Sequence, residues 1–451
     1  MYEESPQRLC ENSPQRSCEK SPQRSCEKSL QPSCEKNPQR SYEKNHQRRR
    51  FIKSAMATAL GAGAAGAGMG PLPRAAAAVP VDTSTKITGI NTFVMRRAIF
   101  VKVTADNGMV GWGECAQNNK ALMETFVHNG LKQQVIGRDP FDTEPLWDQM
   151  FYLNHDLGPG GALANAIAGI DIAIWDLKAR MLGLPVYKLL GGKYRDRVLA
   201  YGSFAVDAGN KMTPKQAAAQ AVDFVRDGFT VVKLRMQIRE YRLNPEPDPT
   251  LVYVRAVDRA IGNDAEIFVD INNGYSAGRA VQVGRQLFEE FGIRYYEEPC
   301  SDQNHRETRQ VVDELQDMLV IAGEKEYTRW QLTELITRAN PDIINPDIVK
   351  AGGITEMKKI AAIAQAFTKP IVCHNTRPTL ATAATLHFAA SISNCGPFVE
   401  FPETKKKFAA LLRVMDTNVR LEDGFLYLPE GPGLGIEVNE QRVRAASQSI
   451  K

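Results

Sequence analysis

The pattern of apolar and polar positions becomes regular near residue 197. From there, short apolar runs typical of strands alternate with amphipathic stretches such as TPKQAAAQAVDFVRDG and TEMKKIAAIAQAF. The eight runs are VLAYGSF, TVVKLRM, EIFVDIN, RYYEEP, LVIAGE, IINPDIV, PIVCHNT and FVEFPE. Alternation of this kind predicts parallel strands joined by helices, and eight units predict a closed barrel over residues 196–420.

The residues before the barrel have a different pattern, typical of a small α+β domain over residues 85–195. Three short β segments come first, and Asn107-Gly108 between the second and third predicts a hairpin. Helices are expected near residues 120–136, 143–153 and 161–182. The last of these is apolar on nearly all faces, which predicts burial. The Gly- and Pro-rich tail, residues 421–451, is expected to return to this domain.

Residues 1–46 repeat an eight-residue unit, as in SPQRSCEK, with almost no apolar side chain to bury. We expect this segment to be disordered. Four of the chain's eight cysteines belong to the repeat, one in each of four units. They are a product of the repetition, so they indicate neither a disulfide framework nor a metal cluster.

Residues 47–80 resemble a twin-arginine export signal. Arg48-Arg49-Arg50 precedes Phe51-Ile52-Lys53, a run of about 17 mostly Ala and Gly residues, and four alanines suited to cleavage. The run is too weakly apolar for a permanent membrane span. We therefore expect export to the bacterial periplasm and no span in the mature protein. The alternative is a disordered basic tail on a cytoplasmic protein.

Charge and composition narrow the function. Hydrophobic residues make up 43% of the chain and charged residues 24%, which permits a large core. The formal net charge is +4, and residues 1–50 account for all of it, because the other 401 residues carry 45 charges of each sign. A folded part without basic excess has no electrostatic basis for binding nucleic acid.

Polar side chains end successive strands of the predicted barrel. They are Lys233, Arg235, Asp270, Glu297, Glu324, Asp347, His374 and Glu400, and from Asp270 onward the gaps are 27, 27, 23, 27 and 26 residues. Such a gap is one strand–helix unit, so these side chains are expected to converge at the mouth where barrel enzymes have their active sites. Three carboxylates on consecutive strands form an all-oxygen set of the kind that Mg²⁺ prefers.

Asp347 and His374 end the next two strands, where a carboxylate can orient an imidazole as a general base. Among the six histidines, His374 alone falls at the end of a predicted barrel strand. His387 lies in an apolar helix, which indicates a packing role. Cys373 adjoins His374 but is expected to point to the other side of the strand, so a Cys–His nucleophilic pair is not predicted.

These residues occur within motifs that resemble the enolase superfamily, in its mandelate racemase and muconate-lactonising branch. The resemblance covers about residues 85–440. The motifs are Asp270-x-Asn272, Glu297-Glu298-Pro299, Gly323-Glu324, Pro346-Asp347 followed by Lys350-Ala351-Gly352-Gly353-Ile354-Thr355, His374, and Glu400.

The resemblance implies a capping α+β domain over a modified TIM barrel, (β/α)₇β, whose second unit lacks its helix. It implies one Mg²⁺ per subunit held by Asp270, Glu297 and Glu324, with Asp347 and His374 as the base dyad. Glu400 would hydrogen-bond a small carboxylate substrate, and Asn272, Lys233 and Arg235 complete the candidate substrate contacts. Lys233, Arg235 and Glu400 are also candidate catalytic residues. A homo-oligomer, dimer or octamer, is implied too.

One departure from the family pattern shapes the expected reaction. The branch usually has Lys-x-Lys on the second barrel strand, whereas this chain has Lys233-Leu234-Arg235. Lys233 can neutralise a substrate carboxylate, but Arg235 stays protonated and is a poor base. A single His base suits β-elimination, so we favour dehydration of a sugar acid to a 2-keto-3-deoxy acid. Arg235 could bind a hydroxyl or a distal carboxylate.

Two other functions stay open at this point. A racemase or epimerase of a 2-hydroxy or amino acid would use Lys233 as the second base. An exported sugar-acid-binding protein on a catalytically inactive barrel is the non-enzymatic alternative. Substrate choice in the family depends on loops over the mouth, here the stretch before Gly158 and residues 239–249.

Overall fold

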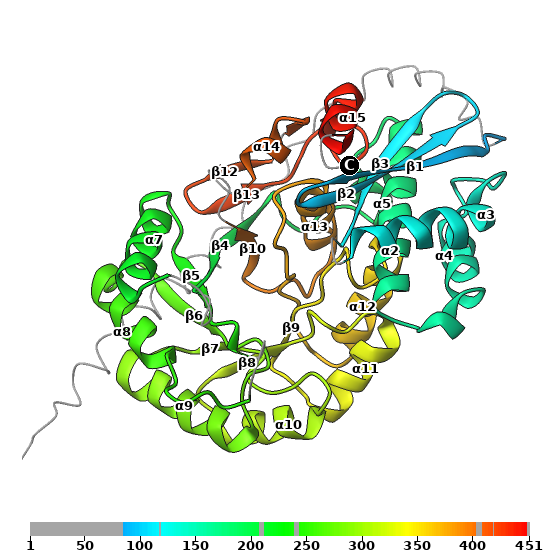
Figure 1. Cartoon of the computed structure of the whole chain (residues 1–451). Helices are drawn as coiled ribbons and strands as arrows, with labels where there is room; N and C mark the ends of the chain where they lie inside the picture. The colour runs from blue at the N-terminus through cyan, green and yellow to red at the C-terminus, as the bar shows by residue number, and fades with distance from the viewer. Residues whose placement is uncertain are drawn as a thin grey trace, which may run out of the picture. The chain divides into compact units, whose positions relative to one another are not determined.

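The computed structural model describes residues 84–116, 119–206, 212–238, 243–402, 408–417 and 419–448 (Figure 1). The predicted repeat, the predicted export signal and residues 239–242 of the second substrate loop lie outside these ranges. Within them, no helix combines the length and the apolar character that crossing a membrane requires.

The N-terminal part is the predicted α+β unit. Strands β1 (Ile87–Met95), β2 (Ala98–Ala105) and β3 (Val110–Cys115) form an antiparallel sheet in that order. The Asn-Gly hairpin between β2 and β3 is confirmed, and Gly108 there has a φ of 81°. The helical segments are α2 (Lys120–Thr125), η1 (Phe126–Leu131), α3 (Lys132–Val135), α4 (Thr143–Tyr152), η2 (His155–Leu157), α5 (Ala162–Met181) and α6 (Val186–Leu189).

Helix α5 packs against the sheet at unusually short range, because glycines stand on both sides of the contact. A Cβ at Gly113 in β3 would overlap the carbonyl oxygen of Gly169 in α5. A Cβ at Gly169 would in turn overlap the sulfur of Cys115. The predicted burial of α5 is confirmed, since most of its side chains are buried. This approach fixes where the end of β3 lies relative to the barrel.

The barrel strands are parallel and follow one another in chain order. They are β4 (Arg197–Ala205), β5 (Val231–Arg235), β6 (Glu266–Asp270), β7 (Tyr295–Glu297), β8 (Leu319–Ala322), β9 (Ile343–Ile344) and β10 (Phe398–Pro402). The seventh predicted run joins by single bridges, Ile344 with Ile371 and Asp347 with His374. Strand β10 then pairs with β4 and closes the barrel.

Helices surround these strands (Figure 1). They are α7 (Pro214–Arg226), α8 (Thr250–Ile261), α9 (Ala277–Phe291), α10 (His305–Glu314), α11 (Arg329–Arg338), α12 (Ile354–Ala366), α13 (Leu380–Ser391) and the short α14 (Ala409–Leu412). Each of the first seven strands is followed by one helix of ten residues or more, and the eighth by α14 alone. This is a (β/α)₇β barrel. The expectation that the second unit lacks its helix is wrong, because α8 lies between β5 and β6.

Aromatic side chains fill the interior of the barrel below the mouth. Tyr201, Phe268 and Phe398 are buried and contact one another, with ring centroids 5.1–6.2 Å apart. The ammonium of Lys233 lies 5.3 Å and 5.4 Å from the centres of the Tyr201 and Phe268 rings. The charged side chains lie at the strand ends, and the ammonium of Lys233 lies against this aromatic layer.

The C-terminal residues form β11 (Met415–Thr417), β12 (Arg420–Glu422), β13 (Phe425–Tyr427), β14 (Ile436–Val438) and α15 (Glu440–Gln448). The β12–β13 hairpin pairs antiparallel with β4 of the barrel, so this part of the tail does not return to the α+β unit as expected. The residues after it do contact that unit. Glu440 pairs with Lys102 of β2 at 2.6 Å, and the backbone N–H of Leu434 donates to Asp176 of α5 at 2.7 Å.

Candidate active site

Strand pairing brings the predicted residues together. In the parallel ladders Arg235 is opposite Asp270, and Asp270 is opposite Glu297. Glu324 follows β8, and Glu400 lies in β10 opposite Tyr201. Every one of these residues except Arg235 is buried, as are Lys233, Asn272, Asp347 and His374. The expected convergence at the carboxyl ends of the strands is present in the structure.

Lys233 is the central cation of the site and is completely buried. Its ammonium lies 2.9 Å from Glu297, 3.2 Å from Glu400 and 3.6 Å from Asp270. Burial alone would lower the pKa of Lys233, but the charges of Glu297 and Glu400 raise it well above its usual value. Lys233 therefore stays protonated and neutralises protein carboxylates. Its contact with a substrate carboxylate stays a prediction.

Glu324 is surrounded by positive charge. One carboxylate oxygen lies 2.5 Å from Nε2 of His374, and the other lies 3.3 Å and 3.4 Å from the ammonium groups of Lys325 and Lys350. Burial would raise the pKa of Glu324, but the charges of His374, Lys350 and Lys325 hold it well below its usual value. Glu324 is thus ionised in a buried position.

His374 and Asp347 form the predicted pair. Nδ1 of His374 hydrogen-bonds to Oδ2 of Asp347 at 2.7 Å, and both side chains are buried. This bond fixes the ring so that Nε2 points into the site, where a base must act. Burial opposes charge on the imidazole, yet Glu324 raises the pKa of His374 to about 9. The base and the predicted metal ligand are therefore electrostatically linked.

The remaining predicted residues, Glu400, Asn272 and Arg235, differ in the hydrogen bonds that their side chains make. Glu400 accepts a hydrogen bond from the backbone N–H of Asn375 at 3.1 Å. Asn272 has a φ of 54°, a left-handed conformation that Asn tolerates, and its side chain donates to Asp270 at 3.2 Å. Arg235 is half-buried, and its Nε makes no hydrogen bond to any described residue. Arg235 is the predicted residue with donor capacity left for a ligand.

The donor set suits a hard divalent cation, since Asp270, Glu297 and Glu324 supply buried carboxylate oxygens from adjacent strands. One oxygen of Glu324 lies 2.5 Å from Nε2 of His374 and the other faces Lys325 and Lys350, so this carboxylate would exchange these contacts for a bound cation. In this structure, however, the three carboxylates turn toward Lys233 and His374. No three His, Cys, Asp or Glu side chains of the described ranges form a ready ligand cluster.

Three contacts at the site were not predicted. Asn345 donates to Glu297 at 2.8 Å, and Lys325 and Lys350 contact Glu324. Each had a signal in the sequence: Asn345 and Lys350 flank Asp347 in the chain, and Lys325 directly follows Glu324. Their positions beside the predicted residues could have marked them as further members of the site.

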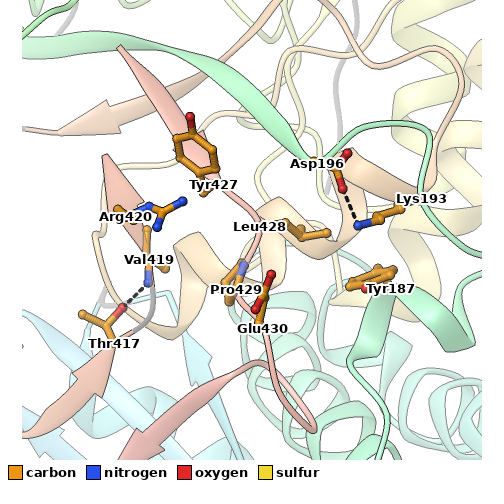
Figure 2. Close-up of a pocket in the computed structure, with 10 residues that line it drawn as sticks. All are labelled: Tyr187, Lys193, Asp196, Thr417, Val419, Arg420, Tyr427, Leu428, Pro429 and Glu430. Carbon is orange, nitrogen blue, oxygen red and sulfur yellow. Dashed lines mark hydrogen bonds and ion pairs between the residues drawn. The ribbon is translucent and has the colours of Figure 1, made fainter. Parts of the chain in front are cut away.

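A cavity lies away from the candidate active site (Figure 2). Its volume is about 580 Å³, and its walls include Tyr187, Asp196, Arg420 and Tyr427. Asp196 directly precedes β4, so the cavity opens near the amino-terminal ends of the strands, away from the mouth. None of the predicted site residues lines it.

Fold and site together define a class: a closed barrel with carboxylates and a His–Asp pair at its strand ends, joined to an α+β cap. The sequence matches two families over these parts. Residues 216–442 match "Enolase C-terminal domain-like", and residues 74–191 match "Mandelate racemase / muconate lactonizing enzyme, N-terminal domain".

Similar proteins support the same assignment. The chain is 31% identical to the D-galactarolactone cycloisomerase of Agrobacterium fabrum, over 77% of this chain and 90% of that protein. It is 30% identical to the D-galactonate dehydratase of Verminephrobacter eiseniae, over 80% and 94%. A mandelate racemase/muconate lactonizing protein from Paracoccus denitrificans, solved with magnesium, aligns with a TM-score of 0.74 and 32% identity, over 80% of this chain and 98% of that one.

The chain therefore belongs to the mandelate racemase and muconate-lactonising branch of the enolase superfamily. The relatives named above are a lyase and an isomerase, so the family is one of enzymes. The resemblance seen in the motifs is confirmed.

Proposed function

We propose that the chain is a hydro-lyase that dehydrates a sugar acid to a 2-keto-3-deoxy acid. The observation that carries the proposal is the asymmetry of the mouth. On one side, His374 is oriented by Asp347 at 2.7 Å. On the other side, β5 offers Arg235, which stays protonated, and Lys233, which three carboxylates engage. The site thus has one competent base. Relatives named D-galactonate dehydratase and arabinonate dehydratase support this reaction class.

The residues divide the reaction between them. Nε2 of His374 accepts the proton from the carbon next to the substrate carboxylate. The hydroxyl on the neighbouring carbon leaves as water, taking a proton that His374 returns when both groups lie on the same face. The resulting enol becomes the 2-keto-3-deoxy acid. Arg235, with an unpaired Nε, holds a substrate hydroxyl or a distal carboxylate. Asn272 and Glu400 complete the substrate contacts.

Asp270, Glu297 and Glu324 would hold one Mg²⁺. Bound there, the ion would offset the second negative charge that the substrate carboxylate acquires as its α-proton leaves. Two findings support this assignment: the buried carboxylates of adjacent strands, and the magnesium in the Paracoccus denitrificans structure.

The test is turnover of an acid-sugar library with Mg²⁺, read by trapping 2-keto products with semicarbazide. We expect hits that the H374N variant loses and that the matched control H128N, which changes a histidine of the cap, retains. Failure of every sugar acid to give a 2-keto product would contradict dehydration.

An isomerase is the second candidate, because the Agrobacterium fabrum relative is named a cycloisomerase. It would give product without loss of water. Exchange of the α-proton in deuterium oxide, or conversion of a lactone, with no semicarbazide signal would favour this candidate.

Export is proposed on the sequence alone. Arg48 and Arg49, the soft apolar run and the alanines after it would direct the folded enzyme to the periplasm. Fractionation of bacterial cells should place the intact chain in the periplasm and the R48K/R49K variant in the cytoplasm. Periplasmic recovery of both would contradict a twin-arginine route.

A further inference from the structure

Arg377 is a buried cation that the proposed reaction does not use. It follows His374 by three residues, is 3% exposed, and lies in the loop between the seventh barrel segment and α13. Its Nε and Nη1 make no hydrogen bond to any described residue. Buried guanidinium nitrogens without hydrogen bonds are costly, so the position of this side chain requires compensation by charge.

Two carboxylates supply that compensation, and they come from different parts of the fold. Nε of Arg377 lies 3.9 Å from Glu114 at the end of β3 in the cap. Nη1 lies 4.0 Å from Oδ2 of Asp347. That oxygen also accepts the hydrogen bond from Nδ1 of His374. Arg377 therefore connects the cap to the far side of the base dyad.

Glu114 is itself held in place. Its Oε2 accepts hydrogen bonds from Oγ1 of Thr379 at 2.5 Å and from the backbone N–H of Ala381 at 3.1 Å, at the start of α13. Its Oε1, which is buried and makes no hydrogen bond among the described residues, is the oxygen that faces Arg377. The close approach of β3 to α5 brings this carboxylate to the barrel.

We propose that Arg377 is a positioning residue for the base, which links Glu114 of the cap to Asp347 and thereby orients His374. The proposal rests on the proposed function. A fixed positive charge beside Asp347 favours the ionised carboxylate, which in turn holds Nδ1–H of His374 and directs Nε2 into the mouth, where it lies 2.5 Å from Glu324 in this structure. The cap thus contributes to the orientation of the base.

The geometry distinguishes this role from substrate binding. Arg377 approaches the dyad from the Asp347 side, whereas the substrate must meet Nε2 on the opposite edge of the ring. Loss of Arg377 should therefore lower kcat and leave KM nearly unchanged.

The kinetic test compares R377M, R377K, D347N and the double variant R377M/D347N with wild type. We expect R377M to lower kcat by about 10–100-fold, as loss of a group that orients a functional side chain typically does, with KM changed by less than about two-fold. R377K keeps the charge and should recover part of kcat. In the D347N background R377M should have no further effect. A raised KM with unchanged kcat, or additive losses in the double variant, would overturn the proposal.

A second measurement separates this proposal from the proposed function. Thermal unfolding of E114Q, R377M and E114Q/R377M needs no substrate, and we expect the double variant to lose less stability than the sum of the two single losses. Additive losses would refute the link between cap and dyad even in an active enzyme. If wild type turns over no sugar acid while the unfolding cycle shows coupling, the proposed function fails and the link stands.

Discussion

The buried carboxylates at the mouth of the barrel and those between cap and barrel differ in the groups that contact them. At the mouth, Asp270, Glu297 and Glu324 face the side-chain cations Lys233, Lys325, Lys350 and His374. Between cap and barrel, backbone N–H groups are the main donors. Asp171 accepts from Thr355 at 3.0 Å, and Asp176 accepts from Trp112 at 2.8 Å and Leu434 at 2.7 Å. Asp176 has one side-chain cation as well, Arg180 at 2.9 Å.

The two sets of carboxylates therefore have different roles, one in the reaction and one in holding the cap on the barrel. Side-chain cations keep Glu324 ionised in spite of burial, so the mouth retains negative charge that a divalent ion can use. Burial raises the pKa of Asp171, which has backbone and hydroxyl donors, to about 7. It also raises the pKa of Asp270 and Glu297 in spite of Lys233, so Glu324 is the mouth carboxylate whose surrounding cations outweigh burial most clearly. Asp171 and Asp176 therefore bind the two parts of the fold together, and their protonation affects stability rather than catalysis.

Removal of divalent ions should have the largest effect. If the mouth carboxylates hold Mg²⁺, excess EDTA should lower kcat by about 10³-fold or more, since the charge that develops on the substrate loses its stabilisation. Added Mg²⁺ should restore turnover and raise the midpoint of thermal unfolding, because a ligand that binds only the folded state stabilises it.

D176N is the matched control for E297Q, because it alters a carboxylate between cap and barrel. The unfolding midpoint of D176N should still rise with Mg²⁺, whereas that of E297Q should not. Full turnover in EDTA, or an equal response of both variants to Mg²⁺, would contradict the division between the two sets.

The pH dependence of stability should depend on Asp171. Its folded pKa is raised from 3.8 to about 7 by burial, with Glu144 adding to the shift and Thr355 opposing it. The folded state thus binds more protons than the unfolded state between these values, and this contribution to stability is lost as pH rises from 3.8 to 7. By linkage the loss is of the order of 4 kcal/mol. Urea unfolding at pH 5 and pH 8 should show a smaller change in the free energy of unfolding in D171N than in wild type. An identical change in both proteins would show that Asp171 is not the group responsible.

The sequence predicted the strand-end residues because each strand–helix unit has nearly constant length. Asp270, Glu297 and Glu324 therefore fall in register from spacing alone. Contacts between distant segments had no such signal. Glu114 and Arg377 are 263 residues apart, and Trp147 donates to the carbonyl of Gly352 across 205 residues. Such pairs depend on how the cap lies on the barrel.

The sequence also did not predict which way the side chains at the mouth point. The side chain of Lys233 reaches three protein carboxylates within the barrel, contacts that the sequence did not predict. Nε of Arg235, two residues later on the same strand, makes no hydrogen bond to a described residue. The pattern of residues predicts which groups gather at the mouth, whereas packing decides which of them pair with each other.

His387 should give a pH effect of opposite sign to that of Asp171. It is buried in α13, accepts the backbone N–H of Tyr187 at 3.3 Å, and burial lowers its pKa to about 4. The unfolded state therefore binds a proton that the folded state excludes, and stability is lost as pH falls from 6.5 to 4. The loss is of the order of 3 kcal/mol. H387Q, which does not titrate, should show a weaker loss of stability between pH 7 and pH 4.5 in urea unfolding. An acid sensitivity equal to that of wild type would show that His387 is not the group responsible.

A substitution at Gly113 tests whether the close packing of β3 on α5 positions Glu114 against the barrel. In G113A the new methyl group would meet the carbonyl oxygen of Gly169, which is backbone and cannot turn aside, so β3 must move away from α5. Overpacking of this kind costs about 1–3 kcal/mol. The matched control is G278A on α9, where a Cβ meets nothing within 4 Å and the helix gains propensity. Urea unfolding should therefore show a loss for G113A and none for G278A. Because Glu114 follows Gly113 directly, G113A should also lower kcat, and an unchanged kcat in a destabilised protein would mean that the cap does not influence the base.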